Sequence, residues 1–188
     1  MTRFLPFILG LLWCGQVTAQ DRWSVKFEPL YGVEHTTNRY PEPPRSTTRT
    51  FFGLRVLAGV PLLALEVEAT SAQDTRNYAS TQQKVEDKVT RGLVGIRTTV
   101  PATSWFATFA RAGARGTIQK TTITNTATGV KEEKDPPLDW DPYAGAGIQV
   151  SIGPLAAVSA GATWFFIDNG PADVQYSLGF TLKFGQTR

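Results

Sequence analysis

The end of the chain alternates strictly between apolar and polar residues. Every second residue of this segment is apolar, and the apolar set consists of Val174, Tyr176, Leu178, Phe180, Leu182 and Phe184. Successive side chains of a β-strand point to opposite sides of the sheet, so the segment predicts a strand with one apolar and one polar face. A tilted strand that crosses a lipid bilayer has a similar length, about 9–11 residues.

Earlier segments repeat this alternation, and eight strands are expected in all. They cover residues 23–33, 51–59, 63–69, 91–100, 105–116, 142–153, 156–166 and 174–184. Short turns at Pro61, Pro101 and Pro154 alternate with polar connections at 35–48, 70–88, 117–141 and 167–173. Turns this short join antiparallel neighbours. The pattern predicts an all-β fold, an eight-stranded antiparallel up-and-down transmembrane β-barrel with short periplasmic turns and long extracellular loops.

The first residues have the layout of a secretory signal. Arg3 precedes an apolar run from Phe4 to Trp13, and small residues lead to a cleavage site after Ala19. The run is too short to span a bilayer as a helix. We therefore expect a signal peptide at residues 1–19 and a barrel domain at 20–188. Acylation of Cys14 as a lipoprotein is disfavoured, because the bulky Trp13 fits that signal badly.

Composition excludes several classes of function. The single Cys lies in the expected signal peptide, and the chain has one His, so neither a disulfide nor a Cys- or His-rich metal site is expected. A formal net charge of +3 over 188 residues argues against a nucleic-acid binder. We expect no cofactor and no metal.

The charged residues decide which face of each strand points inward. Ten of them alternate with the apolar residues of their strands and so share the face opposite the apolar one, which we call the inward parity: Lys26, Glu28, Arg55, Glu66, Glu68, Arg91, Arg97, Arg111, Arg115 and Lys183. Aromatic residues on the apolar parity lie near the turns (Trp23, Phe106, Phe184) and near the loops (Tyr31, Trp164, Phe166, Tyr176). Two such girdles mark the membrane interfaces of outer-membrane barrels. A soluble lipocalin-like barrel would need the apolar stripes inside, and it normally ends in a helix that is not evident here.

The closing strand and a second short motif resemble a known family. Tyr176, Leu178, Phe180, Leu182 and Phe184 are similar to the C-terminal signal that the barrel-assembly machinery reads, although Gly185–Arg188 follow the usual terminal aromatic. Pro142–Gly147 reads PYAGAG, a strand opening frequent in the same superfamily. The chain thus resembles the small eight-stranded Gram-negative outer-membrane barrels, which include the OmpA transmembrane domain, OmpX, Ail and the opacity proteins. The resemblance implies an outer-membrane location, contact with outer-membrane lipid and lipopolysaccharide, use of the assembly machinery, and a monomer.

No catalytic constellation is evident. His35 follows Glu34, but no serine partner has a recognisable spacing, and the late His-x-Ser-Asn motif of lipid A deacylases is missing. We expect a non-enzymatic barrel whose activity lies in surface loops, with an extracellular ligand at 35–48, 70–88 or 117–141. Two alternatives stay open: a narrow small-solute channel and a lipid-A-modifying enzyme.

The lumen is expected to be plugged by charge. Eight strands enclose a space that side chains can just fill. A turn centred on Val60 and Pro61 sets Arg55 opposite Glu66, and Glu28 and Arg97 extend the pair into a ring. Near the loops, Arg91 and Arg115 need carboxylates, for which Asp139 or Asp141 are candidates. The glycines at 145, 147, 161 and 179 are expected to allow tight packing in the lumen, although they could also line a path through it.

Overall fold

The structure is a computed structural model, and it describes residues 23–38, 45–60, 62–79, 81–167 and 172–184. Its elements are nine β-strands: β1 (Ser24–Asn38), β2 (Arg45–Val60), β3 (Leu63–Tyr78), β4 (Gln83–Pro101), β5 (Phe106–Asn125), β6 (Lys131–Lys134), β7 (Asp139–Ser151), β8 (Ala156–Phe165) and β9 (Asp173–Phe184). The expected signal peptide at 1–19 with Cys14, the turn residue Pro61 and the tail 185–188 lie outside the described residues. So do the middle of the first loop, 39–44, and residues 168–171 of the last.

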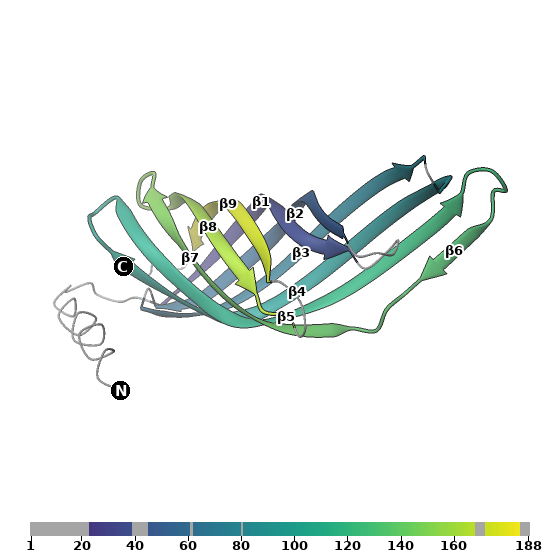
Figure 1. Ribbon diagram of the computed structural model, residues 1–188. Coiled ribbons are helices and arrows are strands. Elements are labelled where there is room, and N and C mark those ends of the chain that lie inside the picture. Colours follow the sequence, from purple (N-terminus) through teal and green to yellow (C-terminus); the bar gives the residue numbers. More distant parts are fainter. Residues whose placement is uncertain (1–22, 39–44, 61, 80, 168–171, 185–188) are drawn as a thin grey trace, which may run out of the picture.

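Eight strands form a closed antiparallel ring (Figure 1). Each strand pairs with its neighbours along the chain, β5 pairs with β7, and β9 returns to pair with β1. The short β6 pairs only with β5, outside the ring. The predicted up-and-down barrel is confirmed. Among the described residues, no helix is long and apolar enough to span a membrane.

Burial alternates along each strand in the sense opposite to that of a soluble protein. On β3, Leu65 and Val67 are 54% and 46% exposed, whereas Glu66 and Glu68 are 0% and 1% exposed. The large apolar residues on the outer face form what we call the apolar belt: Tyr31, Phe52, Leu54, Leu65, Val67, Val94, Ile96, Ile148, Val158, Trp164, Tyr176, Leu178, Phe180 and Leu182. At the level of the apolar belt, the barrel therefore has an apolar outer face, and its charged residues point inward.

The strands are longer than predicted, and the prediction of loops at 35–48, 70–88 and 117–141 is wrong for most of these residues. β3 and β4 stay paired up to Tyr78 and Gln83, and β4 and β5 up to Gln83 and Asn125. Beyond the belt, the outward positions carry polar residues such as Lys88 and Lys120. A strand with water on its outer face has no need of apolar residues there, so alternation of hydropathy ends before the strand does. The same reasoning explains why β6 was missed.

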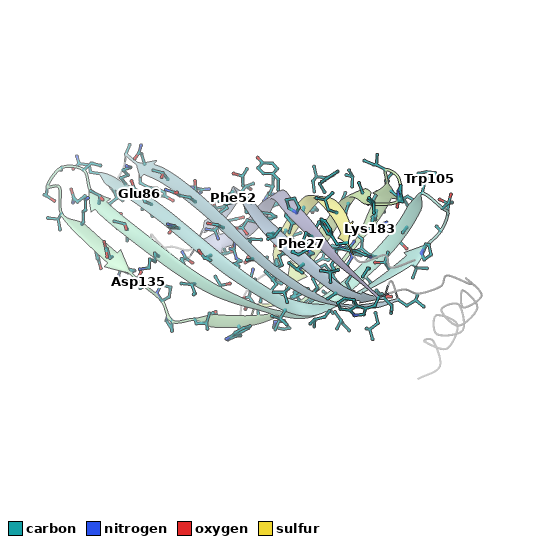
Figure 2. All side chains as sticks on the ribbon, turned by 180° about the vertical axis from the view of Figure 1, so that it is seen from behind. Phe27, Phe52, Glu86, Trp105, Asp135 and Lys183 are labelled. Atoms are coloured by element: carbon teal, nitrogen blue, oxygen red, sulfur yellow. The ribbon has the colours of Figure 1, made fainter. Side chains whose placement is uncertain are left out.

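The two ends of the barrel differ. The short-turn end carries compact connections, in which Phe106 accepts from the amides of Ala102 and Thr103 and Ala156 accepts from the amide of Ile152. At the other end, which we call the hairpin end, the paired strands β3–β4 and β5–β6 project beyond the apolar belt. Figure 2 shows Glu86 and Asp135 at the hairpin end and Trp105 at the short-turn end.

Two glycines on the inner face lie directly against large side chains. A Cβ on Gly147 would lie 2.4 Å from Cζ of Phe109, which is its partner across β5 and β7. A Cβ on Gly179 would lie 2.3 Å from Oε1 of Glu28. Gly145 and Gly161 also have close neighbours on the inner face. These glycines therefore lie where a larger residue would collide with its neighbours, as the packing interpretation expects.

Gly147→Ala is expected to destabilise the barrel by about 1–3 kcal/mol, because the added methyl group forces Phe109 or the β8 backbone to move. Gly92→Ala is the matched control, since a Cβ there meets nothing within 4 Å. Urea unfolding of both variants in detergent micelles measures the difference. Equal unfolding midpoints would contradict the close packing of Phe109.

Candidate functional site

The inner face of the barrel holds all ten charged residues that the sequence assigned to it. Eight of them are buried: Glu28, Arg55, Glu66, Glu68, Arg91, Arg97, Arg111 and Arg115. Lys26 and Lys183 are half-buried and lie at the short-turn end. The ion pairs among the buried residues form one group nearer the short-turn end and two smaller groups nearer the hairpin end.

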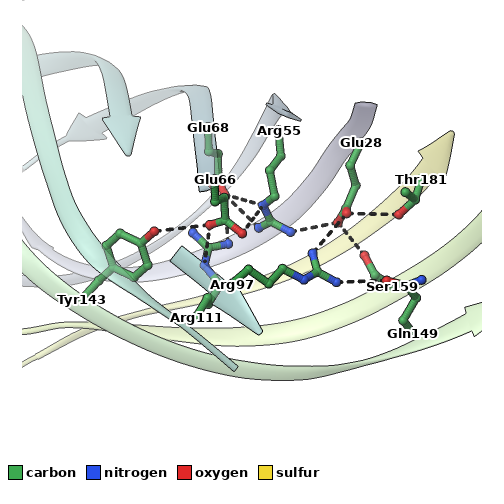
Figure 3. A network of polar contacts seen from close by, with 10 residues as sticks. All are labelled: Glu28, Arg55, Glu66, Glu68, Arg97, Arg111, Tyr143, Gln149, Ser159 and Thr181. Carbon is green, nitrogen blue, oxygen red and sulfur yellow. Dashed lines mark hydrogen bonds and ion pairs between the residues drawn. The ribbon is translucent and has the colours of Figure 1, made fainter. Parts of the chain in front are cut away.

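The lower network consists of three arginines and three carboxylates: Glu28, Arg55, Glu66, Glu68, Arg97 and Arg111 (Figure 3). Arg55 lies at its centre. Its Nη1 is 2.8 Å from Oε1 of Glu28, its Nη2 is 2.8 Å from Oε2 of Glu68, and its Nε is 3.6 Å from Oε2 of Glu66. One cation thus joins carboxylates from two strands, β1 and β3.

Arg97 and Arg111 complete this network from β4 and β5. Nη1 of Arg97 donates to Oε2 of Glu28 at 3.2 Å, and Nη1 of Arg111 donates to Oε2 of Glu68 at 2.9 Å. Nε of Arg111 lies 3.0 Å from Oε1 of Glu66. Buried charges persist when they are paired and hydrogen-bonded, and here the formal charges cancel.

Neutral polar side chains extend the lower network to the remaining strands. The hydroxyls of Ser159 and Thr181 donate to the two oxygens of Glu28 at 2.6 and 3.1 Å. Tyr143 Oη donates to Glu66 at 3.3 Å, and Gln149 accepts from Nη2 of Arg97 at 3.2 Å. All eight strands of the ring therefore contribute to one hydrogen-bonded layer across the lumen.

The predicted register between β2 and β3 is wrong by two residues. Arg55 is the partner of Glu68, and Glu66 is opposite Leu57. The pairing runs up to Val60 and Leu63, so the hairpin is centred one residue later than expected. The shift keeps every side chain on its predicted face, and Arg55 still reaches Glu66 at the longer distance.

The upper network lies nearer the hairpin end and consists of Glu34, Arg49, Arg91, Arg115, Asp141 and Asp173. Glu34 pairs with both Arg49 and Arg91, the latter at 2.6 Å. Nη2 of Arg115 lies 2.5 Å from Asp141, and its Nη1 lies 3.4 Å from Asp173. Among the described residues, no ion pair joins the Glu34 group to the Arg115 group; taken together, the two groups have three cations and three anions.

The sequence identified Asp141 as a partner of Arg115 but missed the partner of Arg91. Asp139, the other candidate, is exposed. Glu34, Arg49 and Asp173 were missed because each lies in or beside a segment interpreted as a loop. Alternation along the strand could have identified two of them. Glu34 lies an even number of residues after Glu28, and Arg49 an even number before Arg55, so both lie on the inward face.

Aromatic rings fill the space between the charges. The guanidinium carbons of Arg97 and Arg115 lie 3.7 and 3.9 Å from the ring centroids of Phe109 and Phe165. Leu93, Tyr143 and Phe165 form a buried apolar cluster. Cation–π contacts of this kind are stronger when water is excluded. Both networks therefore have an aromatic ring packed against one of their arginines.

The structure places Glu34 and His35, the two neighbours considered for a catalytic site, on opposite faces of β1. His35 is exposed on the outer wall, where its Nδ1 lies 2.6 Å from Oγ1 of Thr48 and its ring meets the ring of Tyr176 edge-on. Glu34 points into the lumen instead. Nor does the described part of the chain contain three or more His, Cys, Asp or Glu side chains grouped as metal ligands.

The five residues of the expected assembly signal share the outer face of β9. Tyr176, Leu178, Phe180, Leu182 and Phe184 are all exposed there. Phe184 also stacks edge-on against Phe27 of β1, with ring centroids 5.7 Å apart. Recognition of this stripe by an assembly factor stays a prediction.

Hairpin strands at the other end carry ion pairs of a different kind. Nζ of Lys84 lies 2.5 Å from Oε1 of Glu86, and this hydrogen bond and charge lower the pKa of the Glu86 carboxyl. Lys120 and Asp135 are 3.7 Å apart and both more than half exposed. Such exposed pairs contribute little to stability.

A closed ring of eight antiparallel strands, with an apolar outer belt and an ionic interior, defines a β-barrel of the outer-membrane type. No protein-family model matches the chain, and no curated protein matches it. Solved structures do. Ail, the attachment invasion locus protein of Yersinia pestis, matches with a TM-score of 0.61 and 12% identity over 87% of this chain and 99% of that chain.

Two further structures agree. Neisserial surface protein A matches with a TM-score of 0.61 and 11% identity over 86% of this chain and 97% of its own. The outer membrane protein OprG from Pseudomonas aeruginosa matches with a TM-score of 0.58 and 13% identity over 87% of this chain and 97% of its own. The chain therefore has the fold of the small eight-stranded outer-membrane barrels.

A double-mutant cycle on Arg55→Met and Glu68→Gln tests the lower network. Each single change removes one partner of several buried charges and upsets the charge balance of the network, so it is expected to lower the free energy of unfolding by about 3–5 kcal/mol. The double variant should lose less than the sum, with a coupling of about 0.5–3 kcal/mol. Urea unfolding in micelles provides the measurement.

The exposed pair Lys120 and Asp135 is the control for this cycle. Lys120→Gln and Asp135→Asn should couple by at most about 1 kcal/mol. Strictly additive effects at Arg55 and Glu68 would show that the buried pair does not act as a unit.

Proposed function

We propose that the chain is a non-enzymatic integral protein of the outer membrane whose lumen is closed by the lower and upper networks. The observation that carries the proposal is the inversion of polarity: residues such as Leu65 face outward and Glu66 faces inward on one strand. An apolar outer surface of this extent is stable in lipid, and a closed ring satisfies the strand hydrogen bonds there.

The proposal includes an orientation. The short-turn end lies in the periplasm and the hairpin end outside the cell, as in barrels with short periplasmic turns. Export depends on the expected signal at 1–19, and the apolar belt contacts outer-membrane lipid and lipopolysaccharide. The β9 stripe serves the assembly machinery. The barrel is expected to be a monomer.

The hairpin end is the proposed surface for an extracellular ligand. The ends of β3, β4 and β5, together with β6, form a polar extension beyond the apolar belt (Figure 2). It carries exposed charges of both signs, among them Lys88, Lys120 and Asp135. Rigid strands hold these side chains in fixed positions, which favours recognition of a partner over simple solvation.

Fractionation and gel mobility test the membrane assignment. The full chain should appear in the outer-membrane fraction and migrate differently on a gel before and after heating, because a barrel closed by strand pairing resists detergent until it is heated. A variant with Leu65→Lys and Val67→Lys should lose the membrane fraction, since each lysine at the bilayer centre costs about 2–4 kcal/mol. A soluble periplasmic protein with one mobility at all temperatures would contradict the proposal.

Planar-bilayer recording tests the closed lumen. The purified wild-type barrel should give no steady conductance, because both networks and the rings of Phe109 and Phe165 fill the space between the strands. Removing several large groups at once, as in Arg97→Ala with Phe109→Ala, should permit brief openings. A large steady current through the wild-type protein would favour the small-solute channel instead.

A further inference from the structure

Two lysines face each other at the short-turn end of the lumen. Lys26 on β1 and Lys183 on β9 are direct partners in the antiparallel register, and both have the inward parity of Glu28 and Thr181. Side chains directly opposite in such a pair have Cβ atoms about 4.5–5.5 Å apart, and like charges in this arrangement are destabilising. Figure 2 shows Lys183 towards the same end as Trp105.

The surrounding side chains do not neutralise this pair. Within the described part of the chain, no ion pair joins Lys26 or Lys183 to a carboxylate. Glu28 is the acid that attracts Lys26, but its two oxygens already accept from Arg55, Arg97 and two hydroxyl groups. Across the next strand Lys26 is opposite Leu57, an apolar residue. Arg97 adds a further positive charge beside Lys26.

The two networks described above carry no excess positive charge of their own. Both networks balance three arginines with three carboxylates, and the further buried carboxylate, Asp87, lies on β4 towards the hairpin end, so neither network supplies the two lysines with an anion. Strand pairing holds them together whether or not an anion is present. A partly buried pair of ammonium groups with fixed backbones is a preorganised site for an anion with several oxygens.

We propose that Lys26 and Lys183 bind a phosphate-type oxyanion at the short-turn mouth of the lumen. Each ammonium donates to a different oxygen of the ligand, which relieves the repulsion between them. Ser24, two residues before Lys26 on the same face, adds a hydroxyl at the mouth. Binding requires only the folded barrel. The anion-binding proposal can therefore be tested independently of whether the lumen is closed and of the membrane assignment.

Titration of the full chain in a non-ionic detergent tests the site. Inorganic phosphate is added at constant ionic strength, with chloride as the competing anion, and heat of binding and phosphorus-31 line width are recorded. Wild-type protein should bind saturably. Lys26→Gln and Lys183→Gln should each weaken the affinity roughly tenfold, since each removes one charge-assisted hydrogen bond.

Lys88→Gln is the control, because Lys88 is exposed on β4 at the hairpin end and should leave binding unchanged. Thermal unfolding gives a second readout: phosphate should raise the midpoint of the wild type and leave that of the double glutamine variant unmoved. Glycerol 3-phosphate, a soluble analogue of a phospholipid headgroup, is tested in parallel. Tighter binding than inorganic phosphate assigns a lipid source, and equal or weaker binding assigns free phosphate. Absence of saturable binding, or binding that the lysine variants leave intact, would overturn the proposal.

Discussion

Closure of the sheet between β1 and β9 is the constraint on which the rest of the structure depends. It gives the backbone groups of every ring strand a partner on both sides, so the outer surface can be apolar without leaving a sheet edge exposed. It also leaves an interior too narrow for bulk water and too wide to be left empty. Large side chains must fill that space, and on the inward parity of this chain they are mostly arginines and glutamates.

Charges in such an interior are tolerated only in balanced groups. Taking an ion out of water costs several kcal/mol, and the cost is recovered through partners with good geometry. Glu28 illustrates the outcome, because its two oxygens meet two arginines and two hydroxyls drawn from four other strands. Gly179 lies beside that carboxylate, where any side chain would displace it. The interior is thus specified by charge balance and by space together, and neither network includes the two lysines at the short-turn end.

The sequence predicted the ring and its faces, because alternation of hydropathy reports a strand whose two sides meet different surroundings. It failed where both sides are polar. From Gln73 to Tyr78 and from Gln83 to Lys88 the strands continue in pairs, yet apolar residues no longer mark one face, and the segment was interpreted as a loop. The partners Glu34, Arg49 and Asp173 were lost for the same reason. Hydropathy therefore measures how far the apolar belt extends, and backbone pairing extends further.

Register shows a different limit. A slip of one residue would turn every side chain to the other face, but a slip of two preserves both faces. Pairing Arg55 with Glu66 and pairing it with Glu68 are equally compatible with the hydropathy pattern, and the structure takes the second. What separates them is local shape: the length of the turn after Val60, and matched large and small partners such as Phe109 opposite Gly147 elsewhere in the ring. Those matches join residues far apart in the chain, so they can be recognised only once the strands are already paired. Alternation of hydropathy alone can therefore define which residues form each face of the barrel wall, but not which side chains meet across the strands.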